Sequence, residues 1–271
     1  ASNVTHPLVA ESVTQFQAQA YKELLPSGGP VKTKVLGLEN AETEQQAKRV
    51  KDYLNYLILD RMDEYDSDTD QMLFYLPLSG MTFKKLYFDQ AKQRPVARFV
   101  PAQDVVVPYS ATDLRSAPRI THVLKMTDNE VRKMQVSGFY RDVDLTDDGD
   151  EEVNEVRSKV DELQGTSRTS YTDDTRTVLE MHVELDLDGF EDMGMDGEPT
   201  GIKLPYIVSI DRSSNTILAI RRNYAEADPT REAIPYFVPY KFLPGLGFYG
   251  FGLMHMIGGL GRAATSILRQ L

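Results

Sequence analysis

The 271-residue sequence contains no cysteine, so it offers no disulfide, no thiolate nucleophile and no sulfur ligand for a metal. That absence fits a reducing compartment. No stretch approaches the roughly 18 consecutive apolar residues that a membrane helix needs, and we expect a soluble protein without membrane contact. The four histidines, His6, His122, His182 and His255, are scattered without ligand spacing. We expect His122 and His182 to be structural residues of strands.

The sequence also lacks the common catalytic motifs. It has no GxSxG, no HExxH and no GxxxxGK[ST], which argues against a serine hydrolase, a zinc protease and a P-loop nucleotide-binding protein. None of these motifs therefore indicates a catalytic residue or a cofactor site.

Net charge is -11, and one block of the chain carries it. Residues 142–199 hold 4 basic and 20 acidic groups, whereas the stretches before and after have net charges of only +1 and +4. A sequence-specific nucleic-acid binder usually shows a basic stripe with interleaved aromatics, and this sequence has none. Tight binding of DNA is therefore not expected, although loose passage of DNA past the protein stays open.

The acidic block includes a partial match to a calcium-binding loop. Counting from Asp144, the match places Thr146, Asp148, Gly149, Glu152 and Glu155 at positions three, five, six, nine and twelve of an EF-hand. Thr146 replaces the usual Asp or Asn, and Glu151 stands where an apolar residue is normal. Asp144, Asp148, Glu152 and Glu155 are thus candidate metal ligands, and a solvated charge run is the alternative. If these residues bind calcium, the chain is a stand-alone calcium-binding module.

The first 80 residues favour helices. Apolar spacing predicts a helix over 6–25, with Pro7 in its first turn, and a second over 41–62, with Asn40 as its N-cap. A short strand is predicted at 31–36. A third apolar segment spans 71–78 and ends at the Pro77 to Gly80 stretch.

Strand patterns dominate the middle of the chain. Runs at 81–88, 96–100, 105–107 and 120–126 are predicted to form one small sheet. Thr127 and Glu130 form a capping box for a short helix that should end at Gly138. A helix is expected near 151–163 and disorder over 165–174. Runs at 178–187, 202–210 and 217–224 read as antiparallel strands, with a turn at 211–215.

The predicted fold class is therefore α+β, in five regions. These are an N-terminal helical region (1–80), a small β-rich region (81–141), an acidic insertion (142–175), an antiparallel sheet (176–243) and a glycine-rich elbow leading into a long helix (244–271).

The elbow contains Gly245, Gly247 and Gly250 in a GxGxxG pattern. A dinucleotide fingerprint also needs an acidic residue about 20 positions later, within a strand–helix–strand unit. The main alternative is an α+β enzyme or a ligand- or nucleotide-binding protein that uses this elbow. The last acidic residue of the sequence is Glu232, so this alternative lacks the acidic partner. The glycines, together with Gly252, better suit a sharp backbone bend between packed aromatics.

From Leu253 onward, apolar residues recur at spacings of four and three. They are Leu253, Ile257, Leu260, Ala264, Ile267 and Leu271. The stripe needs a partner helix. The sequence stops within or just after a helix, and we expect it to be part of a longer protein. Gly258, Gly259 and Gly261 each cost about 1 kcal/mol inside a helix. Either the helix begins only near Arg262, or a close neighbour compensates, in the same subunit or in another copy.

Several moderately specific segments resemble the portal proteins of tailed bacteriophages, of the large type found in short-tailed phages. The segments are 6–11 (HPLVAE), 83–89 (FKKLYFD), 99–102 (FVPA) with Asp104, 117–123 (APRITHV), 138–143 (GFYRDV), 220–224 (IRRNY) and 245–271. They span nearly the whole chain.

The resemblance implies a ring of about twelve subunits at one capsid vertex, the head-tail connector, through which DNA is packaged and ejected. It implies antiparallel wing regions, a final helix leading toward a channel stem, and a protein that is not an enzyme and has no catalytic residues or cofactors. Expected partners are other copies of the chain, capsid or scaffolding protein, terminase, a tail adaptor and, transiently, double-stranded DNA. The expected location is the virion, and the host cytoplasm during assembly. Gly245, Gly247, Gly250, Leu253, Ile257, Gly258, Leu260, Gly261 and Ile267 are the candidate packing residues.

Overall fold

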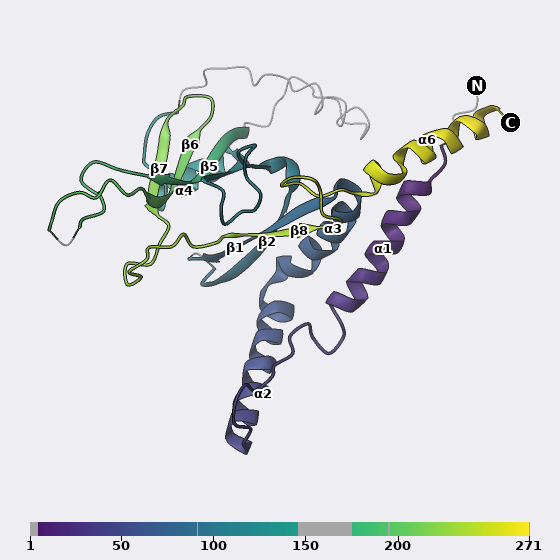
Figure 1. Cartoon of the computed structure of the whole chain (residues 1–271), viewed down its shortest axis with the longest axis horizontal. Helices are drawn as coiled ribbons and strands as arrows, with labels where there is room; N and C mark the ends of the chain where they lie inside the picture. The colour runs from purple at the N-terminus through teal and green to yellow at the C-terminus, as the bar shows by residue number, and fades with distance from the viewer. Residues whose placement is uncertain (1–4, 91, 146–174, 195, 271) are drawn as a thin grey trace. The chain divides into compact units, whose positions relative to one another are not determined.

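The computed structural model describes residues 5–90, 92–145, 175–194 and 196–270. The described chain is α+β, as predicted, with five α-helices and two antiparallel sheets (Figure 1). It forms two compact units. The first consists of residues up to 103, 112–114 and the stretch from 235 onward, and the second consists of 104–111 and 115–234. The predicted helix at 151–163 and disorder at 165–174 lie outside the described residues.

The first unit begins with helices. Helix α1 spans Leu8–Leu24, and α2 spans Ala41–Tyr56 and continues as a π-helical turn, Leu57–Arg61. Both predicted helices are therefore confirmed, apart from the change to π geometry at the end of the second. Asn40 is the N-cap of α2: its side chain accepts a hydrogen bond from the Thr43 amide at 2.8 Å, as its residue type predicts.

The predicted strand at 31–36 is wrong. This segment runs beside α2 without strand pairing. The Val31 amide donates to Asn55 Oδ1 at 2.9 Å, and the Thr33 hydroxyl donates to the Ala47 carbonyl at 3.0 Å. Hydrogen bonds to α2 thus satisfy polar groups of this segment, although its β-branched residues suggested a strand of a sheet.

Helix α3, Asp63–Ser79, is longer than the apolar segment at 71–78 that marked it. Asp63, Glu64 and Asp66 lie in its first turn, where negative charge complements the helix dipole. Pro77 lies in the last turn, and Gly80 ends the helix with a φ of 91°.

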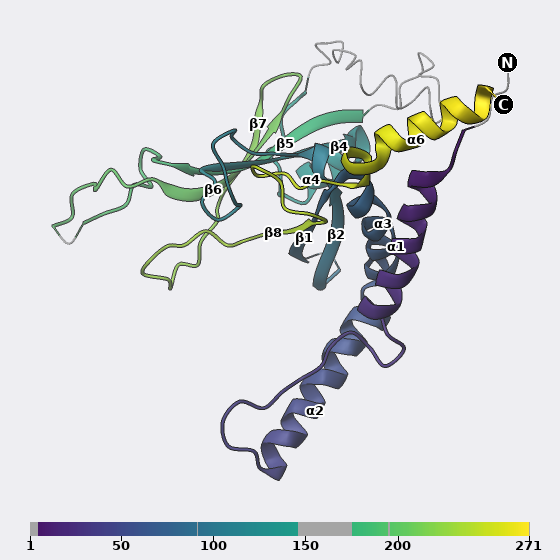
Figure 2. The ribbon, with the colours of Figure 1, turned by 45° about the vertical axis from the view of Figure 1, so that its right-hand side comes forward.

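A three-stranded sheet packs with α3 in the first unit. Its order is β2-β1-β8, with β1 at Met81–Asp89, β2 at Arg94–Pro101 and β8 at Phe237–Lys241. Phe83 and Met81 of β1, Val96 of β2, and Met72 and Leu73 of α3 are almost completely buried. These side chains are the core of the unit. Figure 2 shows α2 extending away from α1 and α6 in this unit.

The second unit is built on a five-stranded sheet in the order β3-β4-β5-β6-β7. The strands are Val105–Val106, Arg119–Thr127, Thr175–Leu185, Leu204–Asp211 and Ile217–Arg222, and a 3-10 turn, Ala102–Asp104, precedes β3. The antiparallel arrangement predicted for the last three strands is confirmed. The single sheet predicted for the four earlier runs is wrong, because β1 and β2 pair with β8, whereas β3 and β4 join β5.

Helix α4, Asp128–Val136, packs on this second sheet. The predicted capping box is present: the Glu130 amide donates to Thr127 Oγ1 at 3.2 Å, and the Thr127 amide donates to Glu130 Oε2 at 2.8 Å. The helix ends at Val136, and Gly138 follows with a φ of 74°, as its residue type predicts. Val131 of α4 is buried with Val178 and Leu218 in the core of the unit.

A buried ion pair fastens α3 to β2. Arg94 donates through Nη1 to Glu64 Oε1 and through Nη2 to Glu64 Oε2, both at 2.8 Å. The two side chains are less than a tenth exposed. The hydrogen bonds from Arg94 lower the pKa of Glu64 from 4.5 to about 2, against the opposing effect of burial.

Glu64→Gln should therefore lower the free energy of unfolding at pH 7 by roughly 3 kcal/mol, since it leaves the Arg94 charge buried without its counter-ion. The pKa of Glu64 is depressed in the folded state. The stabilisation is thus fully present above about pH 4.5 and is lost as the pH falls toward 2.

Denaturant unfolding at several pH values measures this effect, and the variant should lose less free energy of unfolding in acid than the parent chain. Asp63→Asn is the control, because Asp63 is 89% exposed and lies 3.7 Å from Arg94. Equal acid sensitivity of the Glu64→Gln variant and the parent chain would contradict this.

Candidate assembly surface: the glycine elbow and helix α6

The elbow, residues 242–252, connects β8 to α6, Leu253–Gln270, in the first unit. It is tied to the corner where α3 turns into β1. The Phe242 amide donates to the Gly80 carbonyl at 2.9 Å, and the Phe251 amide donates to the Leu243 carbonyl at 3.0 Å. The start of α6 is therefore held against the end of α3.

Three elbow glycines are required by close backbone contact. A Cβ on Gly252 would lie 2.6 Å from both the Gly80 nitrogen and the Leu78 carbonyl oxygen. A Cβ on Gly250 would overlap the Gly80 carbonyl, and one on Gly245 would overlap the Tyr249 carbonyl. The bend interpretation is thus confirmed at these three positions. It is wrong for Gly247, where a Cβ would meet nothing within 4 Å.

Aromatic packing fixes the inner side of the elbow. Phe248 is buried, and its ring stacks on Phe83 of β1 with centroids 6.1 Å apart and planes 15° apart. It also makes a T-shaped contact with the Tyr249 ring, with centroids 5.1 Å apart. Leu246, in the same loop, is fully exposed.

The setting of the elbow differs from that of a dinucleotide fingerprint. Strand β8, which precedes it, pairs antiparallel with β1, and both sheets of the described chain are antiparallel. The fingerprint opens a parallel strand–helix–strand unit instead. The GxGxxG spacing here serves the close contact of two backbone segments.

Helix α6 begins at Leu253, so the expectation of a start near Arg262 is wrong, and Gly258, Gly259 and Gly261 are helical. The helix meets α1 through its small residues. The His6 amide donates to Thr265 Oγ1 at 3.1 Å, and a Cβ on Gly261 would lie 3.8 Å from Val9 Cγ2. A Cβ on Gly258 would meet nothing within 4 Å. Close packing within the subunit therefore does not explain Gly258.

The apolar stripe of α6 points only partly into its own unit. Leu253, Ile257 and Ala264 are half-buried, whereas Leu260 is 64% and Ile267 is 59% exposed. Met256 extends the exposed strip, at 55%. No described residue of α6 is fully buried. Leu271, the last member of the predicted stripe, lies outside the described residues.

A groove of about 530 Å³ lies between α1, α3 and α6. Its walls are largely apolar and include Val9, Val13, Phe74, Leu78, Met254 and Gly258. Arg262 and Arg269 also line it, and no described residue of its lining is acidic. The sequence did not predict this groove, because it depends on how the three helices meet.

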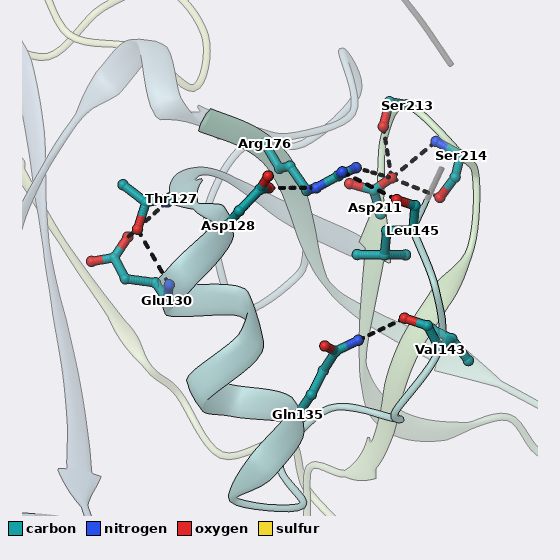
Figure 3. A network of polar contacts seen from close by, with 10 residues as sticks. All are labelled: Thr127, Asp128, Glu130, Gln135, Val143, Leu145, Arg176, Asp211, Ser213 and Ser214. Carbon is teal, nitrogen blue, oxygen red and sulfur yellow. Dashed lines mark hydrogen bonds and ion pairs between the residues drawn. The ribbon is translucent and has the colours of Figure 1, made fainter. Parts of the chain in front are cut away.

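A polar cluster lies in the second unit, around Arg176 of β5 (Figure 3). Arg176 donates to Asp128 Oδ1 of α4 at 2.7 Å and to the Leu145 carbonyl at 3.2 Å. Asp211 lies 3.9 Å away and is completely buried. Burial raises the pKa of Asp211, but hydrogen bonds from Ser214 and Ser213 and the charge of Arg176 outweigh burial and lower it.

This cluster joins four separate segments of the second unit and has a structural role. Ser213 and Ser214 donate to Asp211 Oδ2 at 2.7 and 2.6 Å, which closes the turn after β6. The sequence predicts this turn but not the cluster. The Asp-x-Ser-Ser pattern of residues 211–214 signals the turn, whereas the partner Arg176 is distant in sequence.

The calcium interpretation of the acidic block stays a prediction. Asp144 is described and lines a polar pocket of about 300 Å³ with Asp128 and Arg132, whereas Asp148, Glu152 and Glu155 lie outside the described residues. Among described residues, no group of three or more acidic, histidine or cysteine side chains could hold a metal ion.

The buried histidines belong to strands of the second sheet. His122 lies in β4 and His182 in β5, where His182 Nε2 is 2.9 Å from Glu180 Oε1. Their positions in strands agree with the expectation from the sequence.

Comparison with models of protein families and with curated proteins gave no match to this chain. Within the described residues, no helix combines the length and apolar character that a membrane crossing requires.

The glycine contacts give a direct stability test. Gly250→Ala and Gly252→Ala should each destabilise the chain by about 1–3 kcal/mol, because the added methyl group meets backbone that cannot rotate away. Gly247→Ala is the matched control within the same loop and should change stability by less than about 1 kcal/mol. Thermal or denaturant unfolding measures both. Equal effects at Gly247 and Gly252 would show that the backbone contact does not fix the elbow.

Proposed function

We propose that this chain is part of a bacteriophage portal protein, which forms a ring at one capsid vertex. The ring is the conduit for packaging and ejection of double-stranded DNA and the docking site for terminase and tail. The resemblance of segments spread over nearly the whole chain supports this proposal. The α+β fold with antiparallel sheets and a final amphipathic helix is compatible with it.

The observation that carries the proposal is the surface of α6. The helix has 18 residues, none of them fully buried, and its apolar strip at Met256, Leu260 and Ile267 is more than half exposed. Exposed apolar strips of this kind favour contact with another protein surface. In a ring, the strip on each copy meets a different surface of the next copy, and the same contact is repeated around the ring.

The charge distribution suits a channel through which DNA moves better than a site that binds DNA tightly. The only strong charge feature is the negative block at 142–199, and a channel that moves DNA must not hold its phosphates tightly. Twelve copies of this block around a narrow bore would repel one another strongly. The block therefore belongs on the outer rim or another solvated surface of the ring.

The proposal assigns no catalytic role to any residue and needs no cofactor. Its partners are other copies of the chain, capsid or scaffolding protein, terminase, a tail adaptor and transiently bound DNA. The protein then resides in the virion, after assembly in the host cytoplasm.

Native mass spectrometry and particle images of the full-length protein test the proposal. The expected result is a closed ring of about twelve copies. A protein that stays monomeric or dimeric at micromolar concentration, or that forms open filaments, would contradict it.

Gly258→Leu should impair ring assembly and leave the sheets folded. A Cβ at Gly258 would meet nothing within 4 Å, and leucine there gains up to about 1 kcal/mol of helix propensity. Loss of assembly in a variant that keeps its fold and stability then indicates a contact with a neighbouring copy. Gly259→Leu is the matched control, because Gly259 is exposed, also has free space and gains the same propensity. Circular dichroism checks folding, and native mass checks assembly. If the Gly258→Leu variant forms normal rings, α6 does not contact the neighbouring copy at this position.

A further inference from the structure

Two leucines in the segment just before α2 are almost fully exposed. Leu36 is 88% and Leu38 is 89% exposed, although leucine is normally a core residue. Gly37 between them has a φ of 101°, a conformation that other residues rarely adopt. The backbone therefore bends at Gly37 and presents both leucines to solvent.

Hydrogen bonds to the first turn of α2 hold the segment that carries these leucines. Thr43 Oγ1 lies 3.4 Å from the Leu38 carbonyl that it donates to, and the Asn40 amide donates to Thr43 Oγ1 at 3.0 Å. We name residues 36–44 the α2 tip. The cap of α2 holds it at Leu38, so Leu38 is exposed on a defined turn, and Leu36 lies just beyond the bend at Gly37.

The α2 tip is acidic as well as apolar. Glu39, Glu42 and Glu44 lie within it, and no lysine or arginine occurs between Lys34 and Lys48. Two of these glutamates, Glu42 and Glu44, also occupy the first turn of α2, where negative charge complements the helix dipole.

The groove between α1, α3 and α6 has the complementary character. Its walls are largely apolar, Arg262 and Arg269 line it, and its described lining has no carboxylate. Two apolar side chains with glutamates beside them match an apolar groove with arginines at its side, both in hydrophobicity and in charge.

Within one unit, the tip and the groove lie on different helices, and Figures 1 and 2 both show α2 extending away from α1 and α6. A match between two different surfaces of one molecule is satisfied between copies, in a head-to-tail contact. Such contacts generate a closed ring when the rotation between copies closes.

We propose that the α2 tip of one copy docks into the α1–α3–α6 groove of the next copy. Leu36 and Leu38 enter the apolar part of the groove, and the glutamates of the tip face Arg262 and Arg269. The occupant is a second copy of this chain. Only the closure of the contacts into a ring rests on the proposed function.

The absence of cysteine makes a direct test possible. Two single-cysteine variants of the 271-residue chain, Leu38→Cys and Gly258→Cys, are mixed and treated with a short bis-maleimide. The expected result is a covalent dimer in the mixture and little in either variant alone, because Gly258 lines the groove. Leu246→Cys replaces Leu38→Cys in the control mixture, since Leu246 is fully exposed in the same unit. Equal yields from the two mixtures would overturn the proposal.

A charge exchange tests the same contact without a linker. Glu39→Lys with Glu42→Lys should weaken self-association by about tenfold, and so should Arg262→Glu, because each change opposes like charges. Mixing a chain that carries the two lysines with one that carries Arg262→Glu should restore association between them. Failure of this rescue, with both variants folded, would contradict the docking.

The failure of this inference and that of the proposed function can be distinguished. Normal twelve-fold rings from the full-length Leu36→Ser, Leu38→Ser variant would overturn the tip docking and leave the portal proposal standing. Specific Leu38-to-Gly258 cross-links in open chains, without a closed ring, would support the docking and contradict the portal proposal.

Discussion

The contact of Gly80 with the Gly250 and Gly252 backbone is the constraint on which the first unit depends. It brings the start of α6 against the end of α3, although about 170 residues of chain lie between them. Side chains cannot make this contact, because a single methyl group on Gly252 would enter the backbone of Gly80 and Leu78. The stacked rings of Phe83 and Phe248 then seal the corner. The direction in which α6 leaves the sheet follows from these contacts.

Once α6 is fixed in this way, its surface has two distinct sides. Gly258, Gly261 and Thr265 border α1 and the groove, whereas Leu260 and Ile267 are exposed. An amphipathic helix in a single globular unit normally buries its most apolar side. Here small and polar residues meet the neighbouring helix of the same unit. This division is the physical basis for our proposal that the apolar strip contacts another copy.

Local signals in the sequence predicted local structure well. The caps at Asn40 and Thr127 were predictable because each depends on residues three positions apart. The assignment of strands to sheets was not, because β1 pairs with β8, whose residues lie about 150 positions later. The stripe of α6 was predicted from its periodicity, but the groove was not. It depends on the open space at Gly258 and on the approach of α1, neither of which a periodic pattern contains.

The central claim is that the exposed strip of α6 is an interface between copies, and a structure of the assembled full-length particle tests it most directly. We predict that Leu260 and Ile267 of each subunit are buried against the next subunit, with the Gly80, Gly250 and Gly252 backbone contact unchanged. A closed particle in which Leu260 and Ile267 face solvent, or one in which α6 has left the corner at Gly80, would contradict the account.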